Sequence, residues 1–148
     1  MEEVKHVIDV LLVDDSENDI LMIQDVFEHM QMVNISSVVN DGEEALAYLN
    51  KEGEYANKKT PGLILLDINM PKLNGFEVLE IVKKNEKLKH IPVIMLTTSK
   101  REEDILNSYA KGACSFMTKP VRFTDLQKKI ENFSMYWTSV SKIPEVAN

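Results

Sequence analysis

The sequence lacks the features that would cross-link the chain or carry it through a membrane. Its 148 residues include one cysteine, Cys114, so no intramolecular disulfide can form, and a reducing cytoplasmic location is expected. Apolar runs such as Leu63–Leu66 are far shorter than the roughly 20 residues of a transmembrane helix. The opening residues, Met1–His6, show no signal-peptide pattern. We therefore expect no membrane association.

Positive charge is also scarce. The chain has 17 Lys and Arg against 24 Asp and Glu, a net charge of −7. This balance disfavours binding to nucleic acid or to an anionic membrane surface, and it favours a metal ion or a cationic partner. With five Gly, five Pro and 44% hydrophobic residues, the chain is expected to fold rather than to remain disordered. The length predicts one domain over residues 1–148.

Strand-like and helix-like segments alternate five times. The segments with strand character are Val7–Val13, Val33–Val39, Gly62–Leu66, Pro92–Thr97 and Ala113–Thr118. The helical stripes are Ile20/Ile23/Phe27/Met30, a segment over Gly42–Asn50, Phe76/Leu79/Val82, a segment over Arg101–Lys111, and Leu126/Ile130/Phe133/Trp137. Lys51–Thr60 is polar and is expected to be an exposed loop. The alternation predicts an α/β fold, a doubly wound five-stranded parallel sheet of order 2-1-3-4-5.

Polar side chains follow most of the expected strands directly. Asp14 and Asp15 follow the first strand, Asp67 the third, Thr97 ends the fourth, and Lys119 follows the fifth. Ligands of such sheets bind at the carboxyl ends of the strands, so we expect these groups to lie close together. Three neighbouring carboxylates repel one another, and Mg²⁺ would relieve that repulsion through oxygen ligands. No His or Cys accompanies them in the sequence, so a zinc or copper site is not expected.

The same groups predict a site for a phosphoryl group. Asp67 is the best candidate acceptor, because carboxylates form aspartyl-phosphates. Lys119 and a metal ion would neutralise charge on the transferring oxygens, and the Thr97 hydroxyl would donate a hydrogen bond. Each residue alone has a plain explanation as a cap or a turn former, whereas their joint occurrence at strand ends favours the site.

At these motifs the sequence resembles the receiver domain of bacterial two-component response regulators, a flavodoxin-like fold. The matching segments are Leu12–Asp15, Leu63–Pro71, Asn74-Gly75, Pro92–Thr97 and Gly112–Pro120. The resemblance covers about residues 7–135 and leaves an extended helix and tail over 136–148. It implies a single-domain regulator that accepts a phosphoryl group from a sensor histidine kinase or a phosphotransfer protein and then alters its partner binding.

The resemblance also implies a role for each site residue. Asp67 is the phosphoacceptor. Asp15 binds Mg²⁺ directly and Asp14 binds it through water, with Asp67 and the Asn69 carbonyl as further ligands. Thr97 and Phe116 form the conformational switch, and Lys119 pairs with the phosphoryl group. The Lys119–Pro120 peptide bond is expected to be cis. Two positions depart from the commonest pattern, since Phe116 replaces a frequent tyrosine and Thr98 replaces a smaller residue.

Partner and subgroup follow from the same resemblance. The loop Lys51–Thr60 and the final helix with Tyr136 and Trp137 are similar to regulators that partner bacteriophytochrome-type kinases. A homodimer is predicted through the face formed by the fourth helix, fifth strand and fifth helix. Cys114 is expected to be buried in the fifth strand and inert, and His6, His29 and His90 are expected on the surface.

Three alternatives remain open. The first is a degenerate receiver that binds partners without phosphorylation, which the complete set of acidic, hydroxyl and lysine residues disfavours. The second is a phosphatase or phosphotransferase on the same fold. The position two residues after Asp67 is Asn69, a poor proton donor, so we expect a phosphoacceptor that assists its own phosphorylation and dephosphorylation rather than an enzyme. The third is flavin binding, for which the first strand lacks a Gly-rich phosphate loop.

Overall fold

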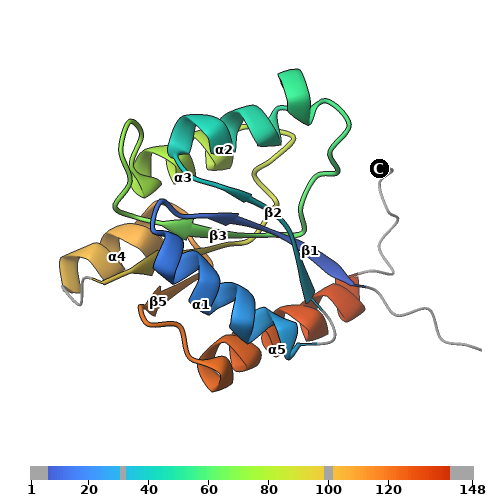
Figure 1. The fold of residues 1–148 in the computed structure, drawn as a ribbon, viewed down its shortest axis with the longest axis vertical. Coiled ribbons are helices and arrows are strands. Elements are labelled where there is room, and N and C mark those ends of the chain that lie inside the picture. The colour runs from blue at the N-terminus through green and yellow to red at the C-terminus, as the bar shows by residue number, and fades with distance from the viewer. Residues whose placement is uncertain (1–6, 31–32, 99–101, 141–148) are drawn as a thin grey trace, which may run out of the picture.

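The computed structural model describes residues 7–30, 33–98 and 102–140, and for residues 102–103 and 132–140 it describes the backbone alone. Strands and helices alternate along the chain, as Figure 1 shows. The elements are β1 (Ile8–Val13), α1 (Glu17–Glu28), β2 (Val33–Val39), α2 (Gly42–Leu49), the 3₁₀ turn η1 (Gly53–Tyr55), β3 (Leu63–Asp67), α3 (Gly75–Lys84), β4 (Val93–Thr97), α4 (Glu102–Ala110), β5 (Ser115–Thr118) and α5 (Phe123–Val140).

The five strands form one parallel sheet of order β2-β1-β3-β4-β5, so the predicted topology is confirmed. The three central strands are mostly apolar and mostly buried, because helices cover both faces of the sheet. The register pairs Val13 with Leu66, Asp67 with Leu96 and Thr97 with Thr118. This alignment brings the carboxyl ends of β1, β3, β4 and β5 to one edge of the sheet.

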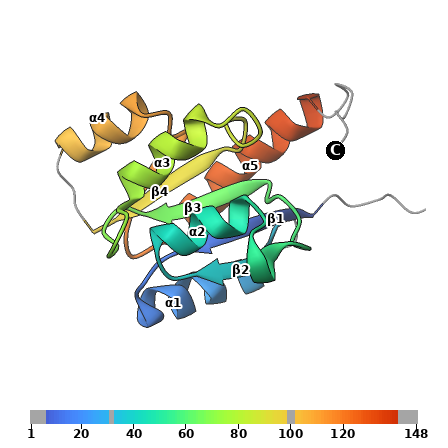
Figure 2. The same cartoon turned by 90° about the horizontal axis from the view of Figure 1, so that it is seen from above.

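Two apolar cores lie on opposite faces of the sheet. On one face, α2 and α3 pack through side chains such as Leu49 and Leu79. On the other face, α1 and α5 pack through side chains such as Phe27 and Leu126. Figure 2 shows these layers from above, with α4 beside α3. The sheet is therefore held rigidly from both sides, which fixes the positions of the residues at its edge.

Side-chain caps begin the helices that start at this edge. The Ser16 hydroxyl accepts a hydrogen bond from the Asp19 amide at the start of α1, and Asp41 accepts one from Glu44 at the start of α2. Asn74 and Glu77 form a reciprocal capping box at the start of α3. Such caps satisfy amides that the first helical turn leaves unpaired, so each loop leaves its strand in a defined direction.

Some local expectations need correction. Cys114 is exposed and lies before β5, which begins at Ser115, so the prediction of a buried strand residue was wrong. The loop Lys51–Thr60 contains η1, whose Tyr55 ring packs 5.2 Å from the Tyr48 ring. His29 and His90 are exposed as predicted.

Several predicted features fall outside the described part of the chain. These are His6, the side chains of Phe133, Tyr136 and Trp137, and the tail over 141–148. Among the described residues, no helix combines the length and the apolar character needed to cross a bilayer.

Candidate functional site

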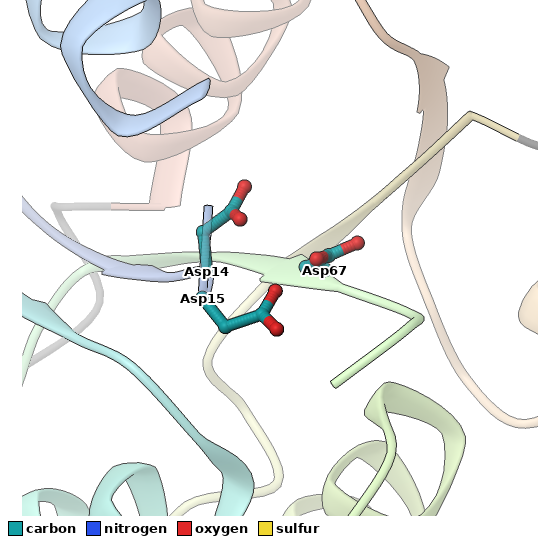
Figure 3. Close-up of side chains that lie close together, drawn as sticks. All are labelled: Asp14, Asp15 and Asp67. Carbon is teal, nitrogen blue, oxygen red and sulfur yellow. The ribbon is translucent and has the colours of Figure 1, made fainter. Parts of the chain in front are cut away.

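Three carboxylates converge at the carboxyl edge of the sheet. Asp14 and Asp15 follow β1, and Asp67 is the last residue of β3 (Figure 3). Each contributes an oxygen that lies within 4.8 Å of the others. Asp14 is fully buried and Asp67 is 4% exposed, while Asp15 is open to solvent. The predicted acidic cluster is therefore present, and it combines two buried charges with one exposed charge.

Backbone contacts hold Asp14 in place. Its amide donates to the Val39 carbonyl at 3.1 Å, which extends the β1–β2 pairing by one residue. Its carbonyl accepts from the Asn40 side chain, and its Oδ1 accepts from the Ser16 amide at 2.9 Å. The remaining oxygen, Oδ2, consequently points into the site.

Lys119, which directly follows the edge strand β5, brings a positive charge to the cluster. Its amide donates to the Thr97 carbonyl at 2.7 Å, and the following Lys119–Pro120 peptide is cis, as predicted. Its Nζ lies 2.7 Å from Asp14 Oδ2 and 3.4 Å from Asp67 Oδ2. The side chain is only 7% exposed, so these ion pairs are shielded from solvent.

A fourth carboxylate also contacts Lys119. Asp19, in the first turn of α1, places Oδ2 at 2.8 Å from Lys119 Nζ. The sequence pattern did not predict this contact, because an Asp in the first turn of a helix is ordinarily explained by the helix dipole. The available signal was its spacing, four residues after Asp15, which puts it one helical turn beyond the strand end.

Burial and charge perturb the acid–base behaviour of this site. Burial raises the pKa of Asp67 from 3.8 to about 6, and the charge of Asp14 adds to the rise. Lys119 and the Asn69 amide, which donates to Asp67 Oδ1 at 3.3 Å, act in the opposite direction. For Lys119, burial lowers the pKa, but the close contacts with Asp14 and Asp19 and the charge of Asp67 outweigh it and raise the pKa above its usual value.

The other predicted site residues lie around this cluster. Thr97 is fully buried at the end of β4 and pairs in register with Thr118. Phe116, on β5, is partly buried and packs against the core beneath α2 and α3. Asn69 is exposed in the turn after β3. The structure thus places Thr97 and Asn69 at the edge that carries the cluster, and Phe116 on the adjacent strand.

A glycine allows the turn after β3 to fold back on the site. The Gly75 amide donates to the Ile68 carbonyl at 2.8 Å. A Cβ atom at position 75 would lie 2.3 Å from the Asp67 carbonyl oxygen and 2.7 Å from the Ile68 Cα. Both neighbours are backbone atoms, so only glycine fits there without displacing Asp67.

The residues present fit a hard divalent cation. The cluster offers carboxylate oxygens alone, which suits Mg²⁺ or Mn²⁺ better than metals that prefer nitrogen or sulfur. Asp14 Oδ2 makes no hydrogen bond of regular geometry within the described residues, although the Lys119 ammonium is 2.7 Å away. Lys119 alone does not offset the repulsion among three carboxylates, and a bound metal cation would relieve what remains.

Comparison with known proteins places this geometry in a family. The family model of the response regulator receiver domain matches residues 10–131. Response regulator Rcp1 of Synechocystis sp. is 38% identical over 135 residues, which is 91% of this chain and 92% of that protein.

Solved structures agree with this match. The phosphorylated cyanobacterial phytochrome response regulator RcpA superposes with a TM-score of 0.73 at 39% identity and covers 90% of this chain and 96% of its own. The Mn²⁺-bound form of Rcp1 gives a TM-score of 0.71 at 39% identity, over 88% of this chain and 94% of its own.

Proposed function

The chain belongs to the response regulator receiver domain family, and we propose that it accepts a phosphoryl group on Asp67 from a histidine kinase or a phosphotransfer protein. One observation carries the proposal most directly. The Asp67 carboxylate lies at the carboxyl edge of the sheet, 3.4 Å from the Lys119 ammonium and beside Asp14 and Asp15. A carboxylate flanked by a fixed cation and a metal-binding pair suits phosphoryl transfer.

The proposed transfer uses the chain's own residues as follows. An Asp67 carboxylate oxygen attacks the phosphorus of a phosphohistidine, a P–O bond forms, the P–N bond breaks, and the imidazole nitrogen leaves with the electron pair. Lys119 stabilises the negative charge on the transferred oxygens. The hydroxyl of Thr97, at the neighbouring strand end, donates a hydrogen bond to a phosphoryl oxygen. A Mg²⁺ ion held by Asp14, Asp15, Asp67 and the Asn69 carbonyl would supply further charge neutralisation.

We propose that phosphorylation switches the surface near α4 through Thr97 and Phe116. Thr97 moves toward the phosphoryl group and leaves space at the end of β4. Phe116, which is partly buried on the adjacent strand, turns to follow it. Because Phe116 has no hydroxyl, its inward state makes no hydrogen bond. In this proposal the protein is a phosphoacceptor and not a turnover enzyme.

We further propose a bacteriophytochrome-type histidine kinase as the donor, a cytoplasmic location and a homodimer through α4, β5 and α5. The phytochrome response regulator RcpA, at 39% identity, supports the first of these. On α4, Leu106 and Tyr109 are 61% and 48% exposed, which suits an interface. Sedimentation that shows a concentration-independent monomer, with and without phosphorylation, would contradict the dimer.

Intact mass spectrometry after incubation with acetyl phosphate tests the phosphoacceptor. We expect one added phosphoryl group that requires Mg²⁺ and is lost in Asp67→Asn. The matched control is Asp25→Asn, which removes an exposed carboxylate from α1 and should label like wild type. Circular dichroism should show that both variants fold.

Other outcomes separate the alternatives. Labelling that persists in Asp67→Asn would move the acceptor to another residue. Absence of labelling in wild type under every condition would favour a degenerate receiver that binds partners without phosphorylation.

A further inference from the structure

The ammonium of Lys119 is shared among three carboxylates in an uneven way. Its short contacts go to Asp14 at 2.7 Å and Asp19 at 2.8 Å, and its longer contact goes to Asp67 at 3.4 Å. A lysine ammonium has three N–H donors, and one of them is hydrogen-bonded to Asp19 Oδ2. The contact with Asp14 is an ion pair without regular hydrogen-bond geometry. In the resting protein, the cation therefore lies nearer to a residue of α1 than to the phosphoacceptor.

A phosphoryl group on Asp67 would need one of these donors. Asp14 is fully buried, so water cannot solvate its carboxylate in place of the Lys119 ammonium, which lies 2.7 Å from its Oδ2. Asp19 is different, because its side chain is 32% exposed and water can solvate its carboxylate when the ion pair opens. Of these two short contacts, the one to Asp19 costs less to break.

We propose that Asp19 is a positioning residue that holds Lys119 in the resting state and is displaced from it by the phosphoryl group. This inference rests on the proposed phosphorylation of Asp67, and it adds that the Asp19 carboxylate competes with the phosphoryl group for Lys119. The Lys119–Asp19 ion pair joins the loop after β5 to the first turn of α1 across 100 positions of sequence. The free-energy cost of opening this ion pair opposes phosphorylation. Once the phosphoryl group is on Asp67, the open ion pair no longer joins α1 to that loop.

The affinity for beryllofluoride, a phosphoryl mimic, measures this competition. With Mg²⁺ at saturation, calorimetry on Asp19→Asn should show a dissociation constant about fivefold lower than that of wild type, the upper range for a partly exposed ion pair. Asp19→Glu restores a carboxylate that can reach Lys119 and should return the constant toward the wild-type value. The Asn variant keeps the backbone amide that Ser16 caps, so α1 should fold normally.

Two controls separate the contact from charge and from structure. Glu17→Gln removes an equal charge from the same first turn of α1 at an exposed position, and its effect on the dissociation constant should be much smaller. In a Lys119→Gln background, Asp19→Asn should give no gain, because the ion pair is already gone. A merely structural role of Asp19 would change thermal stability equally in both backgrounds.

The failures of the two proposals are distinguishable. If wild type binds beryllofluoride and Asp19→Asn binds it no better than Glu17→Gln does, the role of Asp19 is refuted and the phosphoacceptor stands. If wild type takes up neither beryllofluoride nor a phosphoryl group, the phosphoacceptor is refuted, and the role of Asp19 with it.

Discussion

The Asp67 carboxylate is both the proposed acceptor and a source of instability in the metal-free protein. Its pKa rises from 3.8 to about 6 because burial disfavours the charged form. The native state therefore holds the Asp67 proton up to higher pH than the unfolded chain does. Stability falls as pH increases between about 4 and 6, and above pH 6 the full cost of the buried charge is present.

Replacement of Asp67 by Asn should remove this cost. In chelator at pH 7.5, we expect Asp67→Asn to raise the free energy of unfolding by about 3 kcal/mol, since the pKa rises from 3.8 to about 6 and one pKa unit corresponds to about 1.4 kcal/mol. The gain should shrink toward pH 4 and be small at pH 3.5, because Asp67 is then protonated in the native state and mostly protonated in the unfolded chain. Urea unfolding measured from pH 3.5 to 8 tests this.

Asp25→Asn is the matched control, since Asp25 is exposed on α1, and it should change stability by less than about 0.5 kcal/mol at every pH. A gain for Asp67→Asn that is equal at pH 3.5 and pH 7.5 would contradict the role of the buried charge. It would point instead to better packing of the amide.

Residue types at strand ends predicted most of the cluster but not its full pairing. Asp14, Asp15, Asp67 and Lys119 could be brought together from sequence because parallel strands end at one edge. Asp19 could not, since its contact depends on the angle between α1 and the sheet, which periodicity does not define. The exposure of Cys114 was likewise missed, because the apolar pattern does not show where β5 begins.

At the scale of elements, the turn between β3 and α3 is the most constrained connection to the site. The Cβ of an alanine at position 75 would lie 2.3 Å from the Asp67 carbonyl oxygen, so the backbone at position 75 or at Asp67 would have to move. We expect Gly75→Ala to lower the free energy of unfolding by about 2–3 kcal/mol, typical of an overpacked site. It should also weaken Mg²⁺ binding, because Asp67 shifts relative to Asp15.

Gly53→Ala provides the contrast for this prediction. Gly53 has a φ of +55° and open space around its Cβ position. An alanine there should cost about 1–2 kcal/mol through backbone strain alone and leave Mg²⁺ affinity unchanged. If titration calorimetry gave Gly75→Ala the Mg²⁺ affinity of wild type, the turn would not position the acceptor.

The elements themselves were largely predictable because sequence and fold agree at each level. The central strands are continuous apolar runs, since helices cover both of their faces. Helix starts were also encoded, with Ser16, Asp41 and Asn74 as caps. The turn η1 was not predicted, because its packing depends on a single aromatic pair, Tyr48 and Tyr55, rather than on a periodic pattern.

At the scale of the whole molecule, folding gathers part of the negative charge at one end of the sheet. The net charge is −7, and part of it is concentrated in one cluster that folding assembles from β1 and β3. The unfolded chain has no such cluster, so a cation that binds it must stabilise the native state by mass action. Stability should therefore depend on Mg²⁺ concentration rather than on ionic strength alone.

We expect Mg²⁺ at 100 times its dissociation constant to raise the free energy of unfolding by about 2.7 kcal/mol. NaCl should hold ionic strength constant, because salt also screens the net negative charge of the chain. Asp15→Asn removes the exposed member of the cluster and should lose most of this gain at the same Mg²⁺ concentration, while Asp25→Asn should keep it. Equal stabilisation of Asp15→Asn and wild type in thermal denaturation would place the ion elsewhere. Among the described residues of the cluster, Lys119 would then be the only positive charge that offsets the carboxylates. The carboxylates would repel the negatively charged phosphodonor, and the proposed phosphoryl transfer to Asp67 would lose its electrostatic basis.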